Sequence, residues 1–137
     1  EMRGADGGPW SRICALPAFW VGLLYDKESL QDAYNFSKQF MDKKILEEAR
    51  FSSAKFGLNG KIGNTIIKEL AKQVLEISFE GLKRRNCLDA KGIPETQFLD
   101  PLFNIIDSGE TLAEQVLKNY ETQWSKNIDK IFENQIF

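Results

Sequence analysis

The sequence predicts a mostly α-helical chain with one short strand at its N-terminus. Apolar residues recur at intervals of three and four over most of the 137 residues, which is the spacing of amphipathic helices. Residues that commonly cap helices, such as Asp26, Asp42 and Thr111, precede these stretches. The charged opening run, residues 1–7, ends in a Gly-Gly-Pro break and reads as an extended segment. The length suits one domain with a single core.

Composition narrows the class of protein and of partner. Hydrophobic residues make up 42% and charged residues 28%, a balance typical of soluble globular domains. The net charge of −2 provides no basic field for nucleic acid or for acidic lipid. The longest nearly uncharged run, residues 13–25, is too short to span a bilayer, and the acidic N-terminus does not resemble a signal peptide. We therefore expect neither nucleic-acid nor membrane partners.

The chain contains no histidine and two cysteines. Catalysis by a histidine base and metal ligation by histidine are therefore excluded for these residues. A metal would be held by carboxylates, which favours a hard ion such as Mg²⁺. Cys14 and Cys87 are too few for a disulfide scaffold and too far apart for a zinc motif, so we expect reduced thiols.

Three helices are expected in the first third of the chain. They cover residues 13–25, 27–39 and 43–51, with Ser11, Asp26 and Asp42 as their N-caps. The first helix is apolar nearly all round, so we expect it to be buried on most of its faces. Pro17 falls in its first turns or bends it.

The rest of the chain is expected to alternate loops and helices. Residues 52–63 and 87–96 read as loops, and helices are expected at residues 64–85, from Thr96 or Asp100 to Gly109, 111–124 and 128–134. The helix at 64–85 has the strongest periodicity. Thr111 and Glu114 form a capping box in "TLAE".

Two basic stretches could bind phosphate, but each has a simpler explanation. The cluster "KRRN", residues 83–86, suits the negative end of a helix dipole. The segment "SAKFGLNGKIGN", residues 53–64, has three glycines and two lysines but lacks the spacing of a phosphate-binding P-loop. We interpret the first as a helix end and the second as a plain surface loop.

The opening segment places Glu1 and Arg3 on one face of an extended chain. A carboxylate there could hold Mg²⁺, and a guanidinium could neutralise a moving phosphoryl group. A surface ion pair explains the same spacing equally well. The pattern by itself leaves both alternatives open.

A resemblance to a known protein family favours the first of these alternatives. The stretch "EMRGADGGPWSRICALPAFWVGLLYD" closely resembles the glutamate–cysteine ligases of plants and proteobacteria. The resemblance continues through "VLEISFEGLKRRN", "FLDPLFNIIDSGETLAEQVLKNY" and a final Trp…Asp…Phe-Glu pattern, over essentially the whole chain. It implies that residues 1–137 are the C-terminal portion of a single ligase catalytic domain, with an α+β fold related to glutamine synthetase. Residues 1–7 would be an active-site strand and residues 10–137 the helical part.

The resemblance also implies a reaction. These enzymes use ATP and Mg²⁺ to phosphorylate the side-chain carboxylate of glutamate, and the amine of cysteine then displaces phosphate, in the first step of glutathione biosynthesis. The expected location is the cytoplasm for a bacterial source and the plastid for a plant source. We expect the 137 residues alone to be inactive. The alternatives are another ATP-dependent carboxylate–amine ligase and a non-catalytic helical binding module.

Carried over residue by residue, the family pattern E-x-R-x-x-D falls on the opening segment. Glu1 matches the glutamate that ligates Mg²⁺, and Arg3 matches the catalytic arginine near the transferred phosphate. Asp6 would order the end of the strand. Trp10 and Arg12 would wall the substrate pocket.

One further residue has two possible roles, and one segment departs from the family pattern. Cys14 matches a cysteine that forms a regulatory disulfide in plant members with a cysteine far upstream, and a plain buried thiol is the alternative. The plant Thr-Pro-Phe-Arg stretch is replaced here by "LNGKIGN", so its arginine is missing or is replaced by Lys61. No nucleotide contact is therefore assigned to residues 55–64.

Overall fold

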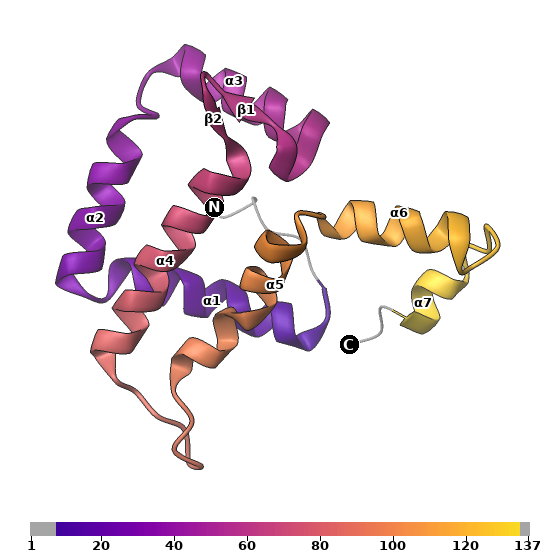
Figure 1. Cartoon of the computed structure of the whole chain (residues 1–137). Coiled ribbons are helices and arrows are strands. Elements are labelled where there is room, and N and C mark those ends of the chain that lie inside the picture. Colours follow the sequence, from indigo (N-terminus) through magenta and orange to yellow (C-terminus); the bar gives the residue numbers. More distant parts are fainter. Residues whose placement is uncertain (1–7, 135–137) are drawn as a thin grey trace.

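The computed structural model describes residues 8–134, and they are mostly helical, as predicted (Figure 1). The helices are α1 (Trp10–Leu24), α2 (Lys27–Lys38), α3 (Lys43–Phe56), α4 (Ile67–Arg85), α5 (Asp100–Ser108), α6 (Leu112–Thr122) and α7 (Lys130–Asn134). Short 3₁₀ turns η1 (Gly57–Asn59) and η2 (Glu95–Leu99) and a hairpin of β1 (Lys61–Ile62) and β2 (Thr65–Ile66) complete the order. The strand predicted at residues 1–7 lies outside the described residues.

Three of the predicted N-caps are confirmed. The Asp26 carboxylate accepts from the Ser29 backbone N–H at 2.9 Å, and the Asp42 carboxylate accepts from the Lys44 N–H at 2.8 Å. Thr111 and Glu114 form the predicted capping box. These side chains satisfy backbone donors that the first turn of a helix leaves free.

The predicted cap at Ser11 is wrong, because α1 begins at Trp10 and Ser11 lies within its first turn. Pro9 occupies the capping position with extended backbone angles, and its carbonyl accepts from the N–H groups of Arg12 and Ile13. A proline is well suited to precede the helix because it has no N–H of its own to satisfy.

The loop predicted at residues 52–63 is also corrected. Helix α3 continues to Phe56 and is stopped by Gly57, whose φ of 55° combined with a ψ of −134° is easily reached only by glycine. The chain then turns through the hairpin at Gly63, also at positive φ, before α4 begins at Ile67. Strands of two residues are too short to produce a readable alternation.

Helices α1 and α4 cross at small residues, which brings their backbones close together. A Cβ atom on Gly22 would overlap the Ser78 carbonyl oxygen, and one on Gly81 would overlap the carbonyl oxygen of Gly22. The fully buried Ser78 hydroxyl donates to the Phe19 carbonyl at 2.8 Å. The apolar core lies beside this crossing, where α5 and η2 also pack, and consists of Leu75, Leu82, Leu99 and Ile106.

The expectation that α1 is buried on most faces is wrong. One side packs on α4, whereas the other exposes a row of large apolar side chains. These are Trp10, Ile13, Trp20, Leu24 and Tyr25. Within residues 8–134, no helix has the length and apolar character needed to cross a membrane. Helices α6 and α7 extend to one side of the other helices (Figure 1).

Candidate functional site

The predicted site residues divide into two groups. Glu1, Arg3 and Asp6 lie outside the described residues, so their roles in metal and phosphate binding stay predictions. Trp10, Arg12 and Cys14 all lie on the first turns of α1. Between residues 8 and 134, no cluster of three or more acidic, cysteine or histidine side chains is arranged to hold a metal ion.

Among the described residues, Trp10 and Arg12 do not line the same pocket, and their shared role in a substrate pocket stays a prediction. Residues two apart on a helix project about 200° from each other. The Trp10 side chain is 69% exposed, whereas Arg12 is half-buried and lines a pocket in which Trp10 takes no part. Of the two, Arg12 alone lines this pocket in the described part of the chain.

The α1–α5 pocket, as we name it, has a volume of about 430 Å³. It is lined by Ser11, Arg12, Pro101, Asn104, Ile105, Ser108 and Gln115. The four residues from α5 recur at intervals of three and four, so one face of that helix forms the floor. We did not predict Asn104, Ser108 or Gln115; the spacing of Asn104 and Ser108, four apart on α5, was the available signal.

Arg12 is the single charged side chain among the described residues that line the α1–α5 pocket. None of its lining residues is acidic, and Arg12 forms no ion pair with another described residue. Burial lowers the pKa of the Arg12 guanidinium from its usual value, since part of its hydration is lost. The Ser108 hydroxyl donates to the Ile105 carbonyl, and the Gln115 amide donates to the Glu110 carbonyl.

Cys14 carries a free, half-buried thiol in a different pocket of about 290 Å³. The pocket is mostly apolar, with Pro17, Val21 and Phe98 among its lining residues. Cys87 is exposed and is also free. A plain thiol and a redox role for Cys14 both remain compatible with this position.

The basic cluster at the end of α4 is satisfied within the protein. Lys83 pairs with Glu80 at 3.2 Å on its own helix. Arg84 pairs with Asp26 at 2.8 Å, and Arg85 pairs with Glu95 at 3.3 Å. These pairs support the interpretation of the cluster as a helix end.

Residues 53–64 do not form a phosphate cradle. The Lys61 N–H donates to the Ser52 hydroxyl at 2.8 Å, and the Gly63 N–H donates to the Glu48 carboxylate at 3.1 Å. Donors that would face a phosphate are therefore already used, and one of them faces a negative charge. This segment comprises the end of α3 and most of the structural turn that leads to α4.

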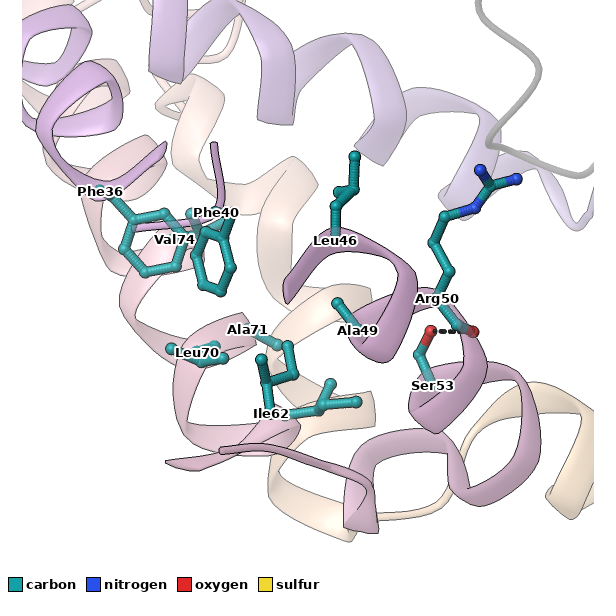
Figure 2. Close-up of a pocket in the computed structure, with 11 residues that line it drawn as sticks. Phe36, Phe40, Leu46, Ala49, Arg50, Ser53, Ile62, Leu70, Ala71 and Val74 are labelled. Carbon is teal, nitrogen blue, oxygen red and sulfur yellow. Dashed lines mark hydrogen bonds between the residues drawn. The ribbon is translucent and has the colours of Figure 1, made fainter. Parts of the chain in front are cut away.

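An apolar groove of about 350 Å³ lies among α2, α3, α4 and β1 (Figure 2). Phe36, Phe40, Leu70 and Ile62 supply much of its surface. The guanidinium of Arg50, at its rim, points away from these side chains (Figure 2). The groove presents no acid or base for chemistry.

Comparison with known proteins gives a consistent result over the whole length. A sequence model of the glutamate-cysteine ligase family 2 (GCS2) matches residues 1–134. The chain is 42% identical to glutamate–cysteine ligase A, chloroplastic, of Oryza sativa subsp. indica, over 137 residues that are all of this chain and 26% of the relative. It is 39% identical to the chloroplastic glutamate–cysteine ligases of Nicotiana tabacum and Arabidopsis thaliana, again over the whole chain and 25% of each relative. The chain thus spans about a quarter of the length of the curated relatives it matches, and it belongs to glutamate-cysteine ligase family 2.

Proposed function

We propose that this chain is the C-terminal portion of the catalytic domain of an ATP-dependent glutamate–cysteine ligase. The observation that carries the proposal is the unbroken family match over residues 1–134, with relatives of that name about 40% identical. The match includes the opening segment, where a glutamate and an arginine stand two residues apart.

The proposed reaction proceeds in two displacements. A side-chain carboxylate oxygen of glutamate attacks the γ-phosphorus of ATP, and ADP leaves. The amine nitrogen of cysteine then attacks the acyl carbon, phosphate leaves, and the nitrogen loses a proton. The product is γ-glutamylcysteine, the first intermediate of glutathione biosynthesis. Both displacements need charge neutralisation at the phosphoryl group more than a histidine base.

In this proposal the opening segment supplies the charged groups. Glu1 holds Mg²⁺, which would neutralise charge on the phosphoryl oxygens when bound. Arg3 neutralises the transferred phosphoryl group, and Asp6 orders the end of the strand. A carboxylate is a suitable ligand for Mg²⁺, and a planar guanidinium is a suitable partner for phosphate.

The exposed side of α1 supports the placement of this chain within a larger catalytic domain. Its large apolar side chains would be costly to leave in water, and contiguous apolar surface of this kind marks an interface. The relatives are about four times as long as the region matched. We propose that the remainder of such a domain covers this side of α1.

The relatives named above are chloroplastic by name. The proposed location is accordingly the plastid for a plant source and the cytoplasm for a bacterial one. Glutamate and cysteine are the proposed small-molecule partners.

A chimera tests the proposal. This chain replaces the matched quarter of the rice ligase, and γ-glutamylcysteine and phosphate release are measured with glutamate plus cysteine or other amines. We expect cysteine-dependent product from the chimera and none from the 137-residue chain alone. Product formed only with another amine would indicate a different carboxylate–amine ligase. A folded chimera with no activity would favour a non-catalytic helical module.

The same chimera tests Arg3. We expect Arg3→Ala to lower turnover by about 100-fold or more, as is usual for loss of a group that stabilises transition-state charge. The thermal midpoint should hardly change. Arg50→Ala, an exposed arginine at the apolar groove, is the matched control and should retain full turnover. Unchanged turnover in Arg3→Ala would remove that residue from the site.

A further inference from the structure

Helices α6 and α7, with the Thr111 cap that precedes them, form an arm that extends away from the other helices (Figure 1). We name residues 111–134 the α6–α7 arm. Helices α2 and α5 pack on α1 and α4, whereas neither α6 nor α7 packs extensively on any helix or strand of the described chain. Within residues 8–134, the segment 116–129 makes no hydrogen bond or ion pair with residues 8–108. The arm is therefore held to the rest of the molecule at its start.

The start of the arm contacts the other helices at two points and follows a glycine. A Cβ atom on Gly57 would lie 2.9 Å from the Thr111 methyl group, so the cap of α6 lies against the turn after α3. Gln115 lines the α1–α5 pocket together with Arg12. Gly109, the C-cap of α5, has a φ of 71°. Because hinges are residues at the ends of elements that absorb changes in backbone angle, Gly109 is the position about which the arm can turn.

The turn between α6 and α7 is fixed by hydrogen bonds within the arm. The Lys126 N–H donates to the Tyr120 carbonyl at 2.9 Å, and the Asn127 N–H donates to the Trp124 carbonyl at 2.8 Å. The Trp124 side chain at this turn is only 8% exposed. A change of backbone angles at the hinge would therefore carry both helices together.

The arm also carries large apolar side chains that lie in water. Leu117, Ile128 and Phe132 are 56%, 57% and 71% exposed. Removing such side chains from water is favourable. The arm would therefore gain free energy by closing onto another surface of the protein.

The arm starts beside the segment that the proposed function makes catalytic. A Cβ atom on Gly8 would lie 3.5 Å from the Cδ atom of Arg12, so Gly8 lies against the Arg12 side chain. Arg12 in turn lines one pocket with Gln115 of the arm. Gly8 directly follows residues 1–7, to which we assign Mg²⁺ and the phosphoryl group. A movement about Gly109 would thus take place next to the proposed site of phosphoryl transfer.

The chemistry of the proposed reaction requires such a site to be closed. Attack of a water oxygen on the acyl carbon of glutamyl phosphate would release phosphate and a proton and regenerate glutamate, so that ATP would be wasted. Closing elements prevent such side reactions because they expel water. We propose that the α6–α7 arm is a lid, hinged at Gly109, that closes over the glutamyl phosphate and excludes water until cysteine attacks. This inference rests on the proposed function for the identity of the intermediate.

The first test measures coupling in the chimera, as phosphate released per γ-glutamylcysteine formed. Leu117→Gln combined with Phe132→Gln should raise this ratio from about one to about two or more, because the lid would no longer exclude water. Both side chains are exposed, so the variant should fold normally. Glu121→Gln, an exposed change on the same helix, is the control and should leave the ratio unchanged. An unchanged ratio in the double variant would overturn the lid.

The second test asks whether the arm moves. Amide hydrogen exchange of the chimera is measured with and without glutamate, Mg²⁺ and a non-hydrolysable ATP analogue. We expect exchange in residues 111–134 to slow at least several-fold when these are bound, and exchange in α4 to stay the same. An arm that is permanently docked on the rest of the domain would exchange equally in both states, which would contradict a hinged lid.

The two proposals fail separately. A chimera without ligase activity would contradict the proposed function, and NMR relaxation of the 137-residue chain would still test the hinge. We expect the backbone amides of the arm to reorient faster than those of α4, and equal reorientation would overturn the hinge. An active chimera whose coupling and exchange do not respond would contradict only the lid.

Discussion

The two sides of α1 are both apolar, yet they meet different surroundings. The inner side carries small residues such as Gly22 and packs its backbone against α4. The outer side carries Trp10, Leu24 and Tyr25, which are 69%, 47% and 71% exposed. Hydrophobicity therefore does not identify the buried side of this helix. Small residues such as Gly22 instead identify where α1 crosses α4, because only small side chains allow two helix backbones to approach closely.

The largest effect is expected from enlarging the inner side. Gly22→Ala places a methyl group where the backbone of Ser78 lies, and backbone cannot move aside cheaply. We expect a loss of about 3 kcal/mol in the free energy of unfolding, at the upper end for overpacking. Urea unfolding followed by circular dichroism measures it. Gly8→Ala, whose added methyl would make ordinary contact with Arg12, is the control, and equal losses would contradict the crossing.

Removing the hydroxyl of Ser78 should have a smaller effect. This group is fully buried and donates to the Phe19 carbonyl across the crossing. Ser78→Ala should cost about 1 kcal/mol, the usual net value of one such hydrogen bond. Ser53→Ala removes an exposed hydroxyl that bonds within its own helix and should change stability much less. The crossing bond would be unimportant if both variants unfolded at the same urea concentration.

Lowering the pH should weaken the ion pair between Asp26, the N-cap of α2, and Arg84, near the end of α4. Hydrogen bonds from Arg84 and from the Ser29 N–H lower the pKa of Asp26 below its usual 3.8. Since the folded pKa is the lower one, this stabilisation is present above the unfolded pKa and is lost as pH falls through the folded pKa.

Asp26→Asn should therefore lower the free energy of unfolding at pH 7. The free energy of unfolding of this variant should also fall less steeply than that of the unaltered chain as the pH drops below about 5. Asparagine can still cap α2, so the variant isolates the charge. Asp32→Asn, an exposed change on the same helix, should keep the steeper decline. Parallel pH profiles for Asp26→Asn and the unaltered chain would refute the role of the ion pair.

The smallest effect is expected on the outer side. Leu24→Gln should change the free energy of unfolding by no more than about 0.5 kcal/mol, because the Leu24 side chain is exposed and the new amide can keep its contact with water. Its neighbour Leu23 is 5% exposed, and Leu23→Gln should cost several times as much because it buries an amide. Similar losses of unfolding free energy in the two variants would contradict the assignment of Leu23 to a buried side of α1 and Leu24 to an exposed one.

The parts of the fold predicted correctly from sequence are those decided by local chemistry. Asp26, Asp42 and the Thr111–Glu114 box are recognisable because a cap bonds residues two or three positions away. The end of α4 was predicted from its basic last turn. The end of α5 was predicted from Gly109, which adopts the positive φ typical of a glycine that ends a helix.

The parts predicted wrongly depend on partners distant in sequence. An apolar stretch does not state which of its sides another element will cover, so the exposure of α1 was missed. The short hairpin at residues 61–66 is held by Ser52 and Glu48 from α3, which no two-residue pattern reveals. Arg12 was singled out only through the family resemblance, and Asn104 was missed because α5 reaches the pocket only through the tertiary fold.

The crossing of α1 and α4 also bears on the order in which the chain can fold. Its hydrogen bond joins residues 59 positions apart, whereas the bond between Lys61 and Ser52 spans nine. Because closing a longer loop costs more chain entropy, the turn between α3 and α4 can form at a smaller cost than the crossing. We therefore expect the contact between Gly22 and Gly81 to form after the local turn, as one of the contacts that join distant parts of the chain.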